Sequence, residues 1–259
     1  MDNVNANARI RVVCRMDDAG SCPSANAAIA EILAHGFARN VSVMACATYF
    51  DEAAAMLRRF PDACIGLHAT IHAEWDEVKW PPVLPPDRAA SLVDENGMLL
   101  ANPMLNHERG VNADEVLAEI AAQLARMRDA GLNVRYMDQH MCFGWLADVG
   151  PRLAALARRE GLLYDEGALG SLPPAPEDVT GLAERFIAQL EAAGPGDYLY
   201  VSHPGRDRPD MRRFTHAGLA PGQVARERDE DRLRYLSPKV MEHAAAHGVA
   251  FVTYADVLT

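Results

Sequence analysis

The sequence is poor in cysteine and has no arrangement of cysteines that would cross-link the chain. Five occur in 259 residues, none of them in a Cys-x-x-Cys pair: Cys14, Cys22, Cys46, Cys64 and Cys142. An odd, scattered set excludes a disulfide framework. Cys14, Cys46 and Cys64 lie in or beside apolar runs, where an unpaired thiol behaves as a small buried hydrophobe. We therefore expect a reducing compartment.

Long apolar runs and basic tracts are also missing. No apolar stretch approaches the length of a membrane-spanning helix, and the polar segment MDNVNANARI (1–10) lacks the apolar part of a secretory signal, so we expect a cytoplasmic protein. Lys and Arg total 25 against 36 Asp and Glu, a formal net charge of −11. The densest charged run, VARERDEDRLR (224–234), mixes both signs and is typical of a solvated helix face. Neither nucleic acid nor an anionic membrane surface is expected as a partner.

What the sequence does contain is an alternation of short apolar runs with helical patterns. The runs typical of strands are 9–14, 41–46, 63–71, 134–138, 162–166, 198–202 and 249–254. The segment 113–131, which ends at Gly131, is the clearest of about six helical patterns between them. Such alternation predicts a parallel sheet, and nearly continuous apolar strands predict a sheet covered on both faces or closed into a barrel.

The chain shows no linker or break in composition. We therefore expect residues 1–259 to form a single α/β domain, an irregular TIM-like (β/α) barrel of about seven parallel strands. One long, proline-rich insertion at about 74–110 carries Trp75 and Trp80. Long loops on such a scaffold usually carry function.

Polar residues follow four of the predicted strands. They are the Asp17-Asp18 pair, His68, the segment from Asp138 to His140, and His203 within a His-Pro-Gly turn. In a parallel α/β barrel the carboxyl ends of all strands meet at one mouth, where active sites form. We therefore expect these side chains to converge.

The mouth could hold a divalent metal ion on Asp18, His68 and His140, because one Asp and two His leave positions open for water. Asp17 and His203 would stay free to act as base and acid. Asp138 lies two residues before His140 on the same strand face, so it is expected to brace the site from behind. A second interpretation stays open at this point, in which the Asp pair caps the next helix and the histidines are hydrogen-bonded structural groups.

Four motifs, in this order, resemble a known family: RMDDAG (15–20), IGLHATIH (65–72), YMDQH (136–140) and YVSHPG (200–205). They look like the motifs of the YdjC-like (ChbG-type) carbohydrate deacetylases, and the similarity extends from about Arg9 to Tyr254. The resemblance implies an irregular (β/α) barrel of the polysaccharide-deacetylase type. It also implies a metal-dependent hydrolase that removes acetyl groups from N-acetylated sugars such as chitooligosaccharides.

Carried over by motif, the resemblance implies the same assignment as the strand ends: Asp18, His68 and His140 as ligands of one divalent metal ion, Asp17 as general base and His203 as general acid or oxyanion partner. Mixed oxygen and nitrogen ligands suit Zn, Mn, Fe or Co; Mg²⁺ stays possible, although it normally prefers oxygen ligands. A homodimer would fit the family.

Four further residues are candidates for substrate contact. Trp75 and Trp80 could stack on sugar faces or pack the insertion against the barrel. Arg206 follows the His-Pro-Gly turn and could reach an anionic substituent or stay solvated, and Cys142 lies near the mouth.

The sequence departs from the family pattern around its motifs. Met16 and Ala19 flank the Asp pair where the family has Ala and Phe, and Cys142 and Gly144 stand where the family usually has further histidines. Two alternatives therefore stay open: another metal-dependent C–N hydrolase on the same barrel, and an inactive homologue that binds metal or sugar.

Overall fold

The computed structural model describes residues 9–165 and 167–258; residues 1–8, most of the polar segment that suggested a cytoplasmic location, lie outside the described residues. Within those ranges eight strands join in one sheet. The strands are β1 (Ile10–Ala19), β2 (Asn40–Val43), β3 (Cys64–Ala69), β4 (Val134–Gln139), β5 (Leu163–Tyr164), β6 (Gly170–Ser171), β7 (Gly196–Ser202) and β8 (Val249–Val252). Their order is β5-β4-β3-β2-β1-β7-β6, with β8 paired to β1, and the pairs are parallel.

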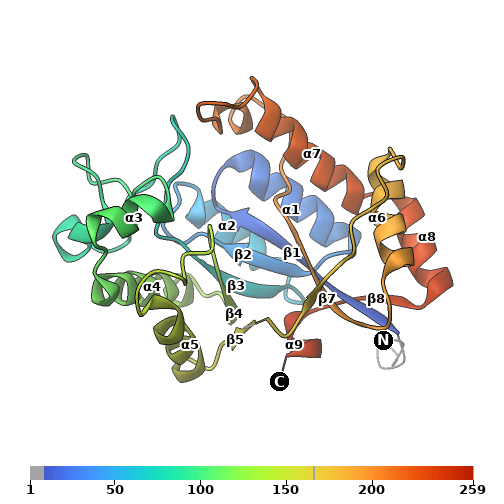
Figure 1. Cartoon of the computed structure of the whole chain (residues 1–259), viewed down its shortest axis with the longest axis horizontal. Coiled ribbons are helices and arrows are strands. Elements are labelled where there is room, and N and C mark those ends of the chain that lie inside the picture. The colour runs from blue at the N-terminus through green and yellow to red at the C-terminus, as the bar shows by residue number, and fades with distance from the viewer. Residues whose placement is uncertain (1–8, 166, 259) are drawn as a thin grey trace.

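Helices follow most of the strands, as the sequence predicts. They are α1 (Pro23–His35), α2 (Phe50–Leu57), α3 (Pro103–Arg109), α4 (Ala113–Asp129), α5 (Val149–Arg159), α6 (Leu182–Ala192), α7 (Gln223–Tyr235), α8 (Pro238–His247) and α9 (Tyr254–Val257). They lie around the outside of the curved sheet, with α4 and α5 near β4 and β5, and α6 and α8 near β7 and β8 (Figure 1). None of the helices in the described ranges combines the length and the apolar character that a membrane span requires.

The sheet curls into a half-barrel, so the predicted TIM-like α/β fold is confirmed, but the barrel is open. The ends of the strand order are β5 and β6, which have two residues each. Such short strands offer few backbone hydrogen bonds with which to close the ring. Strand β6, helix α3 inside the insertion and helix α9 were not predicted, because each is too short to show a period in the sequence.

Strand β1 lies at the centre of the sheet and is longer than predicted. Its first half pairs with β8 and its second half with β2, while β7 runs along its other side. The prediction that it stops at Cys14 is wrong, because the strand continues to Ala19. Its register against β2 shifts between Met16 and Ala19, and Asp18 has a φ of 65°. This bulge breaks the alternation of side chains at the Asp pair.

The insertion at about 74–110 packs against the rest of the barrel. Both carboxylate oxygens of Glu119, on α4, accept backbone N–H groups of the insertion, from Val83 at 2.8 Å and from Leu84 at 2.9 Å. The indole of Trp80 donates to the carbonyl of His72 at 2.6 Å and is 1% exposed. The role of Trp80 as a sugar platform is therefore contradicted. Trp80 packs the insertion onto the barrel, which is the alternative that the sequence left open.

Stability is expected to fall on acidification because of His72. This side chain is 0% exposed, donates to Asn106 Oδ1 from Nε2 at 2.7 Å, and has no partner for Nδ1 among the described residues. Burial, assisted by the charge of His140, lowers the pKa of His72 to about 3. The unfolded chain takes up a proton near the ordinary pKa of histidine, about 6.5, whereas the folded chain does not until the pH approaches 3. The free energy of unfolding therefore decreases as the pH falls below that value.

Between about pH 6.5 and about pH 5 we expect His72 to remove about 2 kcal/mol from the free energy of unfolding. Urea unfolding of the wild type and of His72→Gln at both pH values measures this. The pH dependence should be smaller in the variant by that amount, since Gln keeps a donor for Asn106 and cannot be protonated. An unchanged pH dependence would show that another group is responsible.

Candidate metal centre

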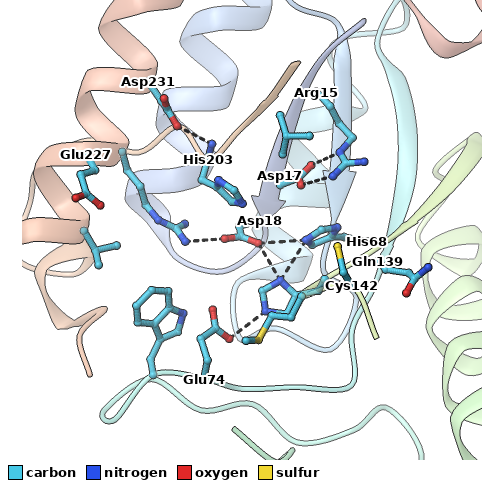
Figure 2. A pocket seen from close by; sticks show the side chains of 16 residues that line it. Arg15, Asp17, Asp18, His68, Glu74, Gln139, Cys142, His203, Glu227 and Asp231 are labelled. Carbon is cyan, nitrogen blue, oxygen red and sulfur yellow. Dashed lines mark hydrogen bonds and ion pairs between the residues drawn. The ribbon is translucent and has the colours of Figure 1, made fainter. Parts of the chain in front are cut away.

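A pocket of about 540 Å³ opens at the carboxyl ends of β1, β3, β4 and β7 (Figure 2). The five side chains predicted to converge at the mouth, Asp17, Asp18, His68, His140 and His203, all line it. A volume of this order accommodates a small molecule such as one or two sugar rings.

Three ligand-type atoms face one another in the pocket. Asp18 Oδ1 lies 3.4 Å from His68 Nε2 and 3.5 Å from His140 Nδ1, and the two nitrogens are 3.2 Å apart. All three side chains are buried. Metal bonds of about 2.0–2.1 Å in a tetrahedron place neighbouring ligand atoms about 3.3–3.4 Å apart. The spacing of the three atoms therefore fits one metal ion.

The second nitrogen of each histidine is held by a carboxylate. His68 Nδ1 lies 2.6 Å from Asp138 Oδ1, and His140 Nε2 lies 3.0 Å from Glu74 Oε2. With these nitrogens protonated, both histidines present lone pairs to Asp18 Oδ1, which itself makes no hydrogen bond among the described residues. Three acceptors facing one another need a cation between them, and a histidine oriented by a carboxylate is the usual form of a metal ligand.

The same negative surroundings act on the histidine pKa values. Burial lowers the pKa of His140, but Glu74 and Asp18 outweigh it and raise the pKa to about 9. Burial also lowers the pKa of His68, and Asp138 and Asp17 hold it well above its usual value. Without a metal ion, protons are therefore attracted to the place where the three ligand atoms meet.

Asp17, His68 and Asp138 form a second group with metal-ligand spacing. This group already has a cation, because Arg15 forms two 2.7 Å bonds to Asp17 and its Nε lies 2.9 Å from Asp138. The set of Asp18, His68 and His140 is therefore the better candidate for a metal site.

Neighbouring side chains fix the position of Asp138. Ser42 Oγ donates to its Oδ2 at 2.5 Å, and Tyr136 OH lies 2.8 Å from Ser42 Oγ. The Tyr136 ring fills the space beside Gly66, where an added Cβ would come within 2.2 Å of it. The glycine two residues before His68 is thus required for the packing behind the histidine.

Glu74 was not among the predicted site residues, and its removal is expected to weaken metal binding. Glu74→Gln keeps an acceptor for His140 Nε2 but removes the charge that orients and polarises the ring. The expected result is a loss of metal affinity of about 10- to 100-fold, measured by competition with a chelator. Glu77→Gln is the control, because that carboxylate lies on the surface 3.5 Å from Arg213. Equal affinities in the two variants would contradict the role of Glu74.

The helix-cap interpretation of the Asp pair is wrong. Helix α1 begins at Pro23, and its N-cap is Cys22, whose sulfur accepts from the N–H of Ala25. Asp17 and Asp18 stay in the strand and turn their carboxylates into the pocket through the bulge.

Comparison with known proteins identifies the chain. Residues 11–172, more than half of the sequence, match the family described as YdjC-like protein. The chain belongs to the YdjC-like family. The match contains the Asp pair, His68 and His140, whereas His203 and α7 lie beyond it.

Curated relatives of this YdjC-like chain carry the name carbohydrate deacetylase. One from Listeria monocytogenes (strain HCC23) is 27% identical over 133 residues, which are 51% of this chain and 51% of the relative. Another from Listeria innocua, carbohydrate deacetylase 1, is 26% identical over 133 residues with the same coverage of both chains. The chain thus spans about half the length of the curated relatives it matches.

Solved structures with low identity show the same fold. A protein from Enterococcus faecalis V583, provisionally described as a cellobiose-phosphate cleavage protein, superposes with a TM-score of 0.79 at 20% identity and covers 96% of this chain and 99% of its own. A Streptococcus mutans CE4 esterase gives a TM-score of 0.51 at 17% identity and covers 96% of this chain and 87% of its own. The YdjC-like chain therefore shares its fold with the Enterococcus faecalis protein over almost the full length of both chains.

Of the other residues predicted to contact substrate, two line the pocket and one does not. Trp75 is 9% exposed and lines the pocket, and Cys142 lines it as an exposed thiol. Arg206 does not line the pocket. Its guanidinium donates to Glu31 at 3.0 Å in a separate surface hollow, so its role in substrate binding stays a prediction.

Helix α7 contributes residues that the sequence interpretation missed. The run 224–234 was predicted to be a solvated face, yet Arg228 is 6% exposed and donates to Asp18 Oδ2 at 2.7 Å. Asp231 accepts the backbone N–H of His203 at 2.9 Å. Arg15 was also missed, although its position two residues before Asp17 was the available signal, since the two share a strand face. Nothing in the mixed charges of α7 marked Arg228.

Proposed function

We propose that this YdjC-like protein is a metal-dependent carbohydrate deacetylase that removes the acetyl group from an N-acetylated sugar. The observation that carries the proposal is the convergence of Asp18 Oδ1, His68 Nε2 and His140 Nδ1 within 3.2–3.5 Å. It is supported by the names of the curated relatives, which are carbohydrate deacetylases. The pocket above these atoms has room for a sugar.

Asp18, His68 and His140 would hold the ion, and Zn²⁺ suits this donor set. A bound divalent ion would supply polarisation of the acetyl carbonyl and a lowered pKa of water. The ion would stay in place because both histidines are braced by carboxylates.

Asp17 is placed to accept a proton from water. Burial raises the pKa of this carboxyl, but Arg15, His68 and His203 outweigh it and bring the pKa to about 2. Asp17 is therefore ionised at neutral pH, and the two bonds from Arg15 fix the orientation of the carboxylate. An ionised and oriented carboxylate can accept a proton from a water whose own pKa a bound metal ion would lower.

His203 lines the same pocket as Asp17 and Asp18, with its ring pointing toward them (Figure 2). In its protonated form it would donate to the leaving nitrogen. The reaction would be hydrolysis of an amide. Water would give a proton to Asp17 and its hydroxyl to the acyl carbon. The C–N bond would break, and the leaving nitrogen would take a proton from His203. The products are acetate and the free amino sugar.

The test is metal analysis of the purified protein followed by acetate release from N-acetylglucosamine oligomers. Stoichiometric zinc, manganese or cobalt with acetate release that a chelator abolishes is the expected result. Bound metal without acetate from any N-acetyl sugar would favour another amide substrate or a binding protein. Absence of bound metal after reconstitution would refute the proposal.

A further inference from the structure

Arg228 is a buried cation in the pocket whose hydrogen bonding is incomplete. Its Nη2 donates to Asp18 Oδ2 at 2.7 Å. Its Nη1 is buried and has no hydrogen-bond partner among the described residues. The residue is 6% exposed and lines the pocket beside Asp18. A buried N–H of a charged group without an acceptor is unfavourable, so a partner is expected to arrive with a ligand.

The guanidinium is held in place by its neighbours. It lies 5.7 Å from the ring centre of Trp75 and 5.4 Å from that of Phe214, within the range of cation–π contacts. The backbone carbonyl of Arg228 accepts the N–H of Gly205 at 3.0 Å, which ties α7 to the turn that carries His203. Arg228 is therefore oriented before any ligand binds.

The acidic groups that line the pocket are already engaged, Glu227 by the side-chain amide of Gln223 at 2.8 Å. Asp17 binds Arg15, and Glu74 binds His140. Asp231 binds both Arg234 and the backbone N–H of His203. The free donor of Arg228 consequently matches an oxygen from outside the chain, best of all one that carries negative charge.

We propose that Arg228 is a catalytic residue whose Nη1 binds the acyl oxygen of the N-acetyl group and afterwards an oxygen of the acetate released. This inference rests on the proposed function and names the residue that would bind the carboxylate of the acetate product. Because one guanidinium contacts both Asp18 and the acyl oxygen, it positions the acyl group next to the metal ligands. A planar fork can make these two contacts together, whereas a single ammonium group at this position would be committed to Asp18.

The experiment measures acetate binding, which requires no turnover. Zinc-loaded wild type, Arg228→Lys and Arg232→Lys are titrated with acetate labelled with ¹³C and followed by NMR, with zinc content and thermal midpoint measured for each. Arg232 is the matched control, since it lies one turn further along α7 and binds Glu31 and Asp229 rather than a pocket residue. We expect acetate affinity at least about tenfold weaker in Arg228→Lys, with zinc content and fold retained, and no change in Arg232→Lys.

Equal acetate affinity in Arg228→Lys and the wild type, or no acetate binding by the wild type, would overturn the proposal. Loss of zinc from Arg228→Lys would also overturn it, because Arg228 would then act only by positioning Asp18. Acetate binding through Arg228 without deacetylation of any sugar would refute the proposed function alone. Deacetylation with unchanged acetate affinity in Arg228→Lys would refute the role of Arg228 alone.

Discussion

Asp18→Asn is expected to abolish stoichiometric metal binding and, with it, deacetylation. Asp18 uses both carboxylate oxygens: Oδ2 accepts from Arg228 at 2.7 Å, and Oδ1 faces the two histidine nitrogens. Asparagine has one carbonyl oxygen. If that oxygen accepts from Arg228, the amide NH₂ points at the histidines and repels a cation. Losing an ion that contributes several kcal/mol to catalysis corresponds to a decrease in kcat of about 10³-fold or more.

Asparagine is the appropriate substitution because the backbone at position 18 is in the left-handed region, with a φ of 65°. Asn tolerates this conformation, whereas Ala would add backbone strain. Alanine would also leave the buried charge of Arg228 without its carboxylate, which is strongly destabilising. Asp197→Asn is the control, since Asp197 binds Arg11 at the opposite end of β7. Metal analysis measures zinc binding in the two variants, and acetate release measures deacetylation. Full zinc occupancy in Asp18→Asn would show that the ion binds elsewhere.

Asp17→Asn is expected to leave metal binding intact and to lower kcat by about 10²- to 10⁴-fold, the usual contribution of a general base. The asparagine retains an acceptor for Arg15, which keeps its second partner Asp138 at 2.9 Å. Asp17 is not in the set of three atoms that fit the metal, so the zinc content should match the wild type. Only the capacity to take a proton from water is lost.

The two neighbouring substitutions thus separate metal binding from proton transfer. Asp18→Asn removes both zinc and turnover, and Asp17→Asn removes turnover alone. Zinc affinity follows from competition with a chelator, and kcat from acetate release at saturating sugar. Loss of zinc from Asp17→Asn would favour the alternative set of Asp17, His68 and Asp138, and unchanged kcat would exclude Asp17 as the base.

Much of the fold could be predicted from local sequence patterns. Apolar runs for β2, β3, β4 and β7 and the helical period of α4 depend on neighbouring residues only, so their positions were predicted closely. The open edge of the barrel was not predictable, since β5 and β6 have two residues each. The bulge at Asp18 was also missed, because a register shift arises between two strands and leaves no pattern within one.

The candidate metal ligands and the residues around them show the same division between local and distant causes. The sequence by itself determined which residues end the strands, and parallel strands bring their carboxyl ends to one edge, so Asp18, His68 and His140 could be named from it. Only the tertiary structure decided what surrounds them: Glu74 on His140, and Arg228 on Asp18 from a helix that the sequence presents as solvated. It also buried Trp80 and turned Arg206 toward Glu31. Strand order follows from local patterning, whereas the contacts of a charged side chain depend on which distant segment packs against it.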